Sequence, residues 1–295
     1  MKKSVNLFIS IFMTCLLLFG LSTTSFAVEY SGDEATEIIP VLHVNLDTQE
    51  ETLFNFTYNP SDNSNTLSSY GSFIDGPSEN SIIGSDDRLP VTNTTTGPYY
   101  GIAYIKTQFN DGSYIPGTGF MISKNVVLTA GHCVYGDGRL EITVYPGRNG
   151  NSYTLSSTVK EIYFFGYDGS NTDLDYSILV LRDNLGSTCG WLGIQAASDS
   201  TLKNLKITTS GYPSDKASGD NRTMWTSTGT ILSVTEKRFK HNADTYSGQS
   251  GSPIYYYNGS YGYQAVGIHT QGGNYARRIT QSLFDFLRLN DMIEI

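Results

Sequence analysis

The chain has 295 residues and a formal net charge of −9 at pH 7. Tyrosine (21 residues) and glycine (30 residues) are abundant, a mixture typical of a β-rich exported protein. The sequence contains no basic patch, which argues against a nucleic-acid partner. After the N-terminal region no apolar stretch reaches the length of about 18 residues that a membrane-spanning helix needs, so we expect no membrane partner.

The first 27 residues have the features of a secretory signal peptide. Lys2 and Lys3 give a positive start, an apolar run extends from Leu7 to Leu21, and Ser25-Phe26-Ala27 ends in a small residue. We expect cleavage after Ala27 and a secreted, extracellular product. The alternative is a membrane anchor, for which the apolar run is short.

The next segment, residues 28–80, is strongly acidic. It contains ten Asp or Glu residues and no Lys or Arg, whereas residues 81–295 carry eighteen acidic and seventeen basic residues. This composition suits a solvated, disordered linker, and it also suits a pro-segment that is removed after export. The remaining domain, 81–295, is long enough for one large β domain or two small ones.

Short apolar runs separated by Gly, Asn, Asp and Pro predict an all-β fold for this domain. Residues 118–122 and 126–129 are predicted to form a hairpin, and its second strand leads into a loop that holds His132. Tyr176 to Leu181 is a nearly continuous apolar run, as expected for a strand buried on both faces, and Asp175 precedes it directly.

The C-terminal part continues the pattern and then changes it. Residues 254–257 and 264–269 flank Asn258-Gly259 and are predicted to form another hairpin. Thr280 can cap a helix, which would place apolar residues on one face by their spacing of three and four: Leu283, Phe284 and Leu287.

Three short segments carry candidate catalytic residues. They are Thr129-Ala-Gly-His-Cys133, Asp175-Tyr-Ser-Ile-Leu179 and Gly248-Gln-Ser-Gly-Ser252. Each alone has an ordinary structural interpretation, but together they supply a base, an orienting carboxylate and a nucleophile in the order His, Asp, Ser. That chain order distinguishes chymotrypsin-type proteases from subtilisins and α/β-hydrolases.

The chemistry requires these residue types. A serine hydroxyl is a weak nucleophile at neutral pH, so Ser250 needs a base, and the imidazole of His132 titrates near the working pH. Asp175 would fix the tautomer of the ring and stabilise the imidazolium. The backbone N–H groups of Gly248 and Ser250 would form the oxyanion hole. Asp168 and Asp173 lie nearby, but Asp175 is the one followed directly by an apolar strand.

The chain resembles chymotrypsin-type serine proteases and, more narrowly, the secreted bacterial glutamyl endopeptidases, over roughly residues 81–290. The resemblance implies two packed, six-stranded antiparallel β-barrels with a C-terminal helix. It is carried by residues 81–88 (SIIGSDDR), 129–133 (TAGHC), 210–213 (SGYP), 244–253 (DTYSGQSGSP) and 267–270 (GIHT).

The resemblance also implies a substrate pocket. In such enzymes a histidine and a Thr or Ser five residues before the nucleophile receive a glutamate side chain, and here these positions are His269 and Thr245. A buried carboxylate needs hydrogen-bond donors and preferably a positive charge, which this pair can supply. We therefore expect cleavage after Glu and less readily after Asp. His241 follows a basic stretch and is predicted to lie at the surface.

By the same resemblance, residues 28–80 are a pro-segment and the mature chain begins at Ser81, after Glu79-Asn80. We hypothesise that this acidic pro-segment occupies the Glu-selecting pocket and acts as an intramolecular inhibitor. A cut after Glu79 would be autocatalytic, and a cut after Asn80 would need another protease. The upstream cysteine that often pairs with the one beside the histidine is absent here, so we expect Cys133 and Cys189 to be free.

We expect a monomer that acts on polypeptides and needs neither a cofactor nor a metal, because no metal-ligand spacing is present. Two alternatives remain open. One is a protease of the same fold with a different or broad specificity. The other is an inactive protein of the same fold that acts as a binding protein or toxin, against which the complete set of His132, Asp175 and Ser250 argues.

Overall fold

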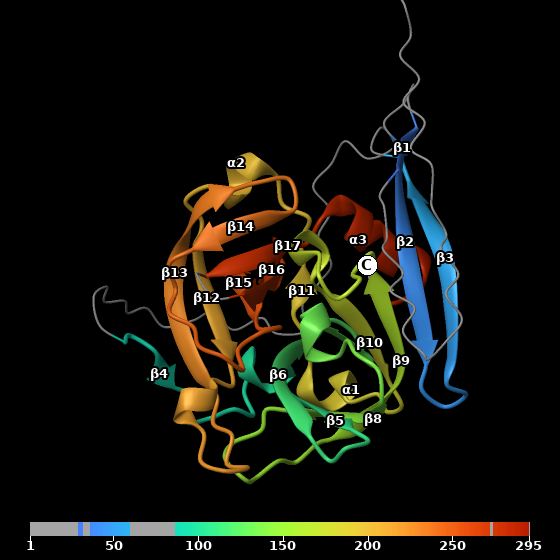
Figure 1. The fold of residues 1–295 in the computed structure, drawn as a ribbon. Coiled ribbons are helices and arrows are strands. Elements are labelled where there is room, and N and C mark those ends of the chain that lie inside the picture. The colour runs from blue at the N-terminus through green and yellow to red at the C-terminus, as the bar shows by residue number, and fades with distance from the viewer. Residues whose placement is uncertain (1–28, 32–35, 60–85, 272–273, 295) are drawn as a thin grey trace, which may run out of the picture.

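The computed structural model describes residues 29–31, 36–59, 86–271 and 274–294. The predicted signal peptide and the predicted maturation sites at Glu79 and Asn80 lie outside these residues. The described part consists mostly of β-strands, which form two sheets that each close into a barrel (Figure 1). None of its helices is long and apolar enough to cross a lipid bilayer.

The first sheet has nine strands and contains the N-terminal barrel. Its strands are β1 (Glu29–Ser31), β2 (Thr36–Asn45), β3 (Glu50–Tyr58), β5 (Ile102–Phe109), β6 (Tyr114–Met121), β7 (Val126–Thr129), β8 (Arg139–Pro146), β9 (Ser157–Phe165) and β10 (Ser177–Leu181). Six of these, β5 to β10, pair antiparallel in a closed circuit.

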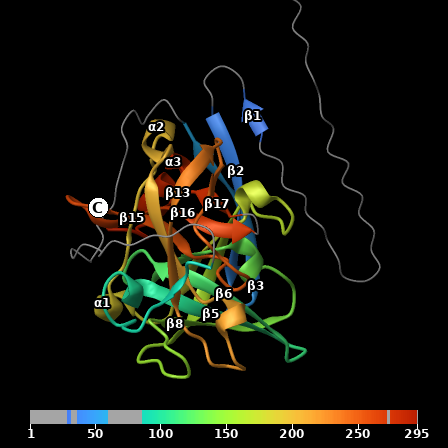
Figure 2. The same ribbon diagram turned by 90° about the vertical axis from the view of Figure 1, so that its left-hand side faces the viewer.

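The second sheet has eight strands and contains the C-terminal barrel. Its strands are β4 (Leu89–Pro90), β11 (Gly193–Ile194), β12 (Lys206–Gly211), β13 (Trp225–Val234), β14 (Arg238–His241), β15 (Pro253–Asn258), β16 (Gly262–Gln271) and β17 (Tyr275–Arg278). Strands β12 to β17 close the second antiparallel circuit. Figure 2 shows the strands of this barrel stacked above those of the first.

The α-helices are α1 (Gly186–Cys189), α2 (Asp199–Leu202) and α3 (Gln281–Leu289). The predicted two-barrel, all-β fold with a C-terminal helix is therefore confirmed. The hydroxyl of Thr280 accepts a hydrogen bond from the Leu283 amide at 3.4 Å, so the predicted cap of α3 is present. The apolar face of this helix is buried, because Leu283, Phe284 and Leu287 join a core shared with the first barrel.

Both predicted hairpins are present. Strands β6 and β7 pair with Gly119 opposite Thr129, and β15 and β16 pair around the turn at residues 259–261. Strand β10 is buried almost throughout, as its apolar run predicts. Ser177 at the start of β10 pairs with Thr129 at the end of β7, so the loop after β7 and the loop before β10 leave the first barrel at the same place.

The acidic segment contains one structure that the composition did not predict. Strands β2 and β3 form an antiparallel hairpin in which Glu37 pairs with Tyr58 and Asn45 with Glu50. Strand β2 also pairs with β9, so the hairpin extends the first sheet (Figure 1). Interpreting residues 28–80 as a wholly disordered linker is therefore wrong for residues 36–58.

Candidate active site

His132 and Asp175 form the centre of the site. The ring atom Nδ1 of His132 lies 2.7 Å from Oδ2 of Asp175, and the backbone amide of His132 donates to Oδ1 at 2.9 Å. Because a carboxylate can only accept, Nδ1 carries the proton and Nε2 is left as the basic nitrogen. The side chain of Asp175 is 3% exposed and that of His132 is 38% exposed, so the ring faces solvent and its partner does not.

The pKa of His132 is raised by its neighbours. Burial by itself would lower the pKa of His132, but the hydrogen bond to Asp175, together with the neighbouring Cys133, raises it above its usual value. A raised pKa indicates that the imidazolium form is stabilised. Such stabilisation is useful in a base that must hold a proton during a reaction.

Local packing fixes the loop of His132. Strand β7 ends at Thr129, and residues 131–133 form a single 3₁₀ turn. A side chain at Gly131 would come within 2.6 Å of the ring of Tyr167, so only glycine allows the two loops to approach so closely. Asn171 caps the 3₁₀ turn Thr172–Leu174, which ends immediately before Asp175.

The loop of Ser250 lies against the same region. The Thr118 amide donates to the Ser250 carbonyl at 2.8 Å, and the sulfur of Cys133 lies 3.6 Å from that oxygen. The hydroxyl of Ser250 donates to the carbonyl of Thr270 at 3.5 Å, a long hydrogen bond. The structure thus brings the backbone of Ser250 next to the residue that follows His132, while the Ser250 hydroxyl points to Thr270.

The backbone around Ser250 is held in an unusual conformation. Gly248 has a φ of +91°, and a Cβ atom there would lie 2.6 Å from the Tyr212 carbonyl oxygen. The Thr118 hydroxyl donates to the Gly248 carbonyl at 2.8 Å, which directs this peptide group. Within the described residues, the amides of Gly248 and Ser250 donate to no partner, so both are available to bind an oxyanion.

His269 and Thr245 both belong to the second barrel, His269 on β16 and Thr245 in the segment between β14 and β15. His269 belongs to β16, where its carbonyl accepts from the Gly251 amide at 2.7 Å and its amide donates to Ser252 at 2.8 Å. The Thr245 hydroxyl donates to Oδ1 of Asn274 at 2.7 Å, a partner that the sequence did not indicate. His269 is 4% exposed, and burial lowers its pKa to about 3.

His241 is not at the surface, and the prediction that placed it there is wrong. Its side chain is 1% exposed, and its ring packs edge-on against that of His269 with the centroids 5.5 Å apart. Burial lowers its pKa to about 4, against an opposing contribution from the backbone of Ala243. Two buried, neutral imidazoles are therefore in contact, and that of His269 belongs to the strand residue bonded to the Ser250 loop.

Residues 86–88, which begin the long described part of the chain, also approach this region. The amide of Asp87 donates to Oδ2 of Asp244 at 3.2 Å, immediately before Thr245. The guanidinium of Arg88 bonds Asp86 and Asp215, which anchors this segment to the loop after β12. Burial, with the nearby carboxylate of Asp244, raises the pKa of Asp87 despite its bond from Ser227.

Cys133 and Cys189 are both buried free thiols. Burial raises the pKa of Cys189 to about 12, so it is an unreactive core residue. Cys133 packs against Gly117, where a side chain would approach its sulfur to 2.9 Å. Across the described residues, no group of three or more His, Cys, Asp or Glu side chains is placed to hold a metal ion.

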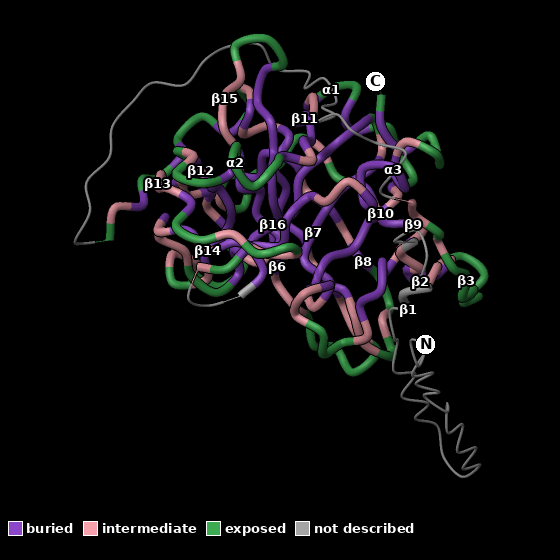
Figure 3. The backbone as a smooth tube through the Cα atoms, turned by 90° about the horizontal axis from the view of Figure 1, so that it is seen from above, coloured by how far each residue is buried: buried purple, intermediate pink, exposed green. Residues whose placement is uncertain are grey.

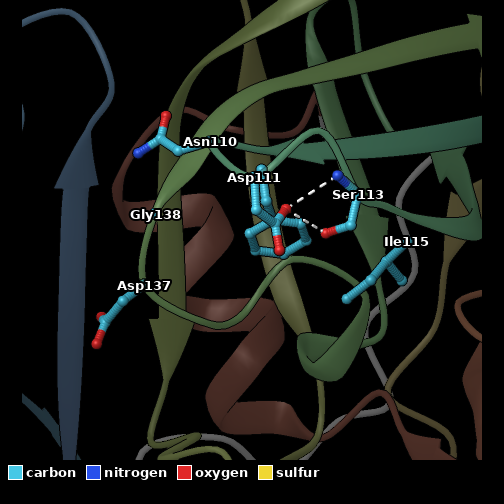
Figure 4. Close-up of a pocket in the computed structure, with 7 residues that line it drawn as sticks. Asn110, Asp111, Ser113, Ile115, Asp137 and Gly138 are labelled. Carbon is cyan, nitrogen blue, oxygen red and sulfur yellow. Dashed lines mark hydrogen bonds between the residues drawn. The ribbon is translucent and has the colours of Figure 1, made fainter.

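A hollow of about 400 Å³ lies elsewhere, between the β5–β6 turn and the turn after residue 136 (Figure 4). The carboxylate of Asp111 there accepts bonds from the amide and hydroxyl of Ser113 at 2.9 and 2.6 Å. Those bonds complete an ordinary turn. None of the residues proposed for catalysis lines the hollow, and we assign it no role in the chemistry.

The sequence model of the Trypsin family matches residues 92–287, more than half of the chain. The chain therefore belongs to the trypsin family of serine proteases. A glutamyl endopeptidase of Bacillus licheniformis is 40% identical over 223 residues, which cover 70% of this chain and 68% of that protein. A Bacillus subtilis protein named extracellular metalloprotease is 36% identical over 216 residues, with the same shares covered.

A solved structure, described as a Glu endopeptidase in complex with MPD, has the same fold with a TM-score of 0.62 and 30% sequence identity. The match covers 98% of that chain but 71% of this one. The resemblance to glutamyl endopeptidases inferred from the motifs is confirmed by these relatives.

Proposed function

We propose that this trypsin-family protease is a secreted endopeptidase that hydrolyses peptide bonds after Glu, and less readily after Asp. The observation that carries the proposal is the position of a buried, neutral His269 directly beside the loop of Ser250. A pocket that ends in such a ring offers hydrogen bonding and a charge that a carboxylate can induce. The 40% identity to a glutamyl endopeptidase supports it.

The reaction begins with Ser250. Its hydroxyl leaves the Thr270 carbonyl, donates to Nε2 of His132 and attacks the scissile carbonyl while Nε2 takes its proton. Hydrogen bonds of this kind are often long or misaligned in a free enzyme and tighten when the substrate binds. Asp175 holds the ring by Nδ1 and stabilises the imidazolium that forms.

The tetrahedral intermediate places its negative oxygen against the amides of Gly248 and Ser250. His132 then gives its proton to the leaving amine, the C–N bond breaks, and an acyl-enzyme remains. A water molecule loses a proton to His132 and attacks the ester, and the released Ser250 oxygen regains that proton. No cofactor is needed for any of these steps.

Recognition of Glu changes the charge of the pocket. In the free enzyme His269 is neutral at working pH, because burial lowers its pKa to about 3. An entering carboxylate raises that pKa, since an opposite charge within about 4–6 Å favours the protonated ring. The substrate thus brings in the group that makes His269 a cation, and the Thr245 hydroxyl exchanges its bond to Asn274 for one to the same carboxylate.

Export and activation complete the proposal. Residues 1–27 direct secretion, and residues 28–80 are a pro-segment that inhibits the protease until the chain is cut after Glu79 or Asn80. The acidity of this segment suits a pocket that accepts carboxylates. Sequencing the N-terminus of the secreted protein distinguishes an autocatalytic cut after Glu79 from a cut by another protease.

Cleavage-site mapping tests the specificity. A denatured protein is digested with the secreted enzyme, and mass spectrometry of the peptides should find most cuts after Glu and a minority after Asp. Cuts mainly after Lys, Arg or large apolar residues would refute the proposed specificity for Glu but would still show that the protein is a protease.

Labelling with a phosphonofluoridate tests the chemistry separately, because only an activated serine reacts fast. The label should appear on Ser250 and be absent from Ser250→Ala, whose turnover should fall by roughly 10⁶. A protein that takes up no label would be an inactive relative.

A further inference from the structure

The first barrel leaves part of one strand without a partner inside the protease domain. Strand β9 pairs with β10 along one edge, through residues 159–164. Along its other edge β8 reaches only Ser157 and Thr158. The rest of that edge, residues 161–165, would present unpaired backbone groups, which is a site for the addition of another strand.

The hairpin of residues 36–58 occupies this edge. Strand β2 pairs antiparallel with it from Val41 opposite Phe165 to Asn45 opposite Glu161, and the Leu46 amide continues the ladder to the Lys160 carbonyl at 2.9 Å. Among the described strands the outer strand β3 pairs with β2 alone, and it faces solvent along most of its length (Figure 3). The backbone pairing of the hairpin with the first barrel is thus made by β2.

Side chains of β2 are buried on both of its faces. Ile39 and Val41 are 2% and 0% exposed and join the core that contains α3. Val44 is 3% exposed and joins the interior of the first barrel. A segment that only linked two domains would not contribute residues to two hydrophobic cores.

An aromatic cluster joins the hairpin to the C-terminal helix. The ring of Phe286 on α3 is contacted by Phe54 and Phe56 from the hairpin, with centroids 6.4 and 5.3 Å away. From β9, the rings of Tyr163 and Phe165 contact Phe286 at 6.0 and 5.0 Å. The hairpin therefore covers the seam between the last helix and the first barrel, and it supplies two of these four rings.

Charged groups fix the hairpin at both of its ends. At the turn, the carboxylate of Asp47 accepts two hydrogen bonds from the guanidinium of Arg182, which lowers its pKa. At the other end Glu37 pairs with Lys237, 3.4 Å away, in the turn between β13 and β14. Two acidic residues of the pro-segment are thus paired with bases of the protease domain on this surface.

We propose that the 161–165 edge of β9 and the aromatic face of α3 form a docking site for the hairpin of residues 36–58, which stays bound without a covalent link. The proposal rests on the proposed cut between the pro-segment and the protease domain. The docking site is the anchor that keeps the pro-segment on the enzyme. The match with the solved Glu endopeptidase covers 98% of that chain but 71% of this one. A match of this length accounts for the protease domain and not for the pro-segment as well.

The test uses the full chain with Ser250→Ala, so that the protein cannot digest its own fragment. A recognition sequence for an unrelated, highly specific protease is inserted between residues 70 and 71, and the purified precursor is cut there. Gel filtration at micromolar concentration should show the N-terminal fragment eluting with the protease domain, and urea should separate them. Elution of the fragment apart from a folded protease domain would overturn the proposal.

Paired variants locate the contact. Val41→Asp puts a charge into the core and should release the fragment after cutting, whereas Leu53→Asp, at a position of the same hairpin that is 55% exposed, should leave it bound. Equal retention of both fragments would contradict docking through β2.

A second variant avoids the core, because Val41→Asp could prevent folding. Arg182→Asp should increase the dissociation constant of the cut fragment about two- to fivefold, the usual effect of losing an exposed ion pair. The reversed pair, Asp47→Arg with Arg182→Asp, should restore it. Failure of the reversed pair to restore binding would show that the hairpin does not dock in this register. Because these measurements use an inactive protein, they are independent of Glu specificity.

Discussion

Gly248 offers a sharp test of the oxyanion hole, because the substitution Gly248→Ala is opposed by both conformation and space. A residue with a side chain at a φ of +91° is strained by about 1–3 kcal/mol. The new Cβ atom would also lie 2.6 Å from the Tyr212 carbonyl oxygen, so the backbone of the loop must move. We expect the free energy of unfolding to fall by about 2–4 kcal/mol in total.

The effect on activity should exceed the effect on stability. The movement displaces the amide of Gly248, one of the two proposed oxyanion donors, and loss of one such donor costs about 10²–10³ in kcat. Gly112→Ala is the matched control, since Gly112 has a φ of +84° but no atom within 4 Å of its Cβ position. The free energy of unfolding of Gly112→Ala should fall by the backbone strain, about 1–3 kcal/mol, and its kcat should not change.

The assay measures kcat and KM on a Glu-containing peptide together with the thermal midpoint of each variant. The reasoning predicts that Gly248→Ala loses kcat with little change in KM, because an oxyanion donor acts on the transition state. A Gly248→Ala enzyme with full kcat would refute the placement of the oxyanion hole. An equal loss of kcat in Gly112→Ala would show that strain alone, and not the position of the amide, lowers the rate.

Three further predictions follow from the histidines. Asp175→Asn should lower kcat by about 10⁴ and move the acid limb of the kcat/KM profile to lower pH, because the carboxylate raises the pKa of His132; an unmoved limb would contradict this pairing. His269→Leu should lower kcat/KM for Glu substrates by about 10²-fold, since a buried carboxylate loses its partner; phosphonofluoridate labelling of Ser250 should proceed at the usual rate, and a loss of labelling would indicate damage to the triad instead. His269 and His241 have folded pKa values of about 3 and 4, below the unfolded value, so they take up protons only on unfolding as the pH falls below about 6.5. In urea unfolding of Ser250→Ala, the free energy of unfolding should therefore fall by about 3 kcal/mol between pH 6.5 and 5. Adding His241→Phe to this protein should remove about half of that fall. If the dependence of the free energy of unfolding on pH is unchanged by His241→Phe, the acid sensitivity belongs to other groups.

The parts of the fold that the sequence predicts are those with local patterns. The hairpin of β6 and β7, the buried strand β10 and the capped helix α3 each follow from the spacing of apolar residues and from a turn or cap within a few positions. The pairing of His132 with Asp175 was predicted from the order of the motifs together with the family resemblance, and the structure brings the two residues within hydrogen-bond distance.

The hairpin of β2 and β3 was not predicted, because its stability lies in its partner. The acidic composition of residues 28–80 as a whole suggests a solvated segment, although residues 36–45 include five apolar residues in a poorly alternating order. What makes them a strand is the edge of β9, more than a hundred residues away in the chain, and the rings on α3. The local sequence of a segment does not show whether a distant strand has an unpaired edge with which the segment can pair.

The burial of His241 could have been found in the sequence. Residues 238–241 alternate between basic and non-basic side chains, and in a strand such alternation places residues 239 and 241 on one face. The structure buries Phe239 and His241 and leaves Arg238 and Lys240 partly exposed. The prediction that His241 lies at the surface was based on the charge of its neighbours, whereas the alternation of residue types along the strand indicates which residues are buried.

The neutral state of His269 determines how the enzyme should distinguish Glu from Gln. Glu can convert the ring to a cation, and the complex then holds one proton more than the free enzyme, whereas Gln, which has nearly the same shape, only hydrogen-bonds to a neutral ring. Between the pKa of His269 in the free enzyme, about 3, and its higher pKa in the Glu complex, each pH unit should lower the ratio of kcat/KM for Glu over Gln about tenfold, because formation of the charged pair requires proton uptake there. Titration of His132 affects both substrates equally and cancels in this ratio. Matched peptides that differ only in this residue, measured from acidic to alkaline pH, give the ratio directly. A ratio that stays constant over that range would mean that His269 recognises Glu as a neutral hydrogen-bond donor.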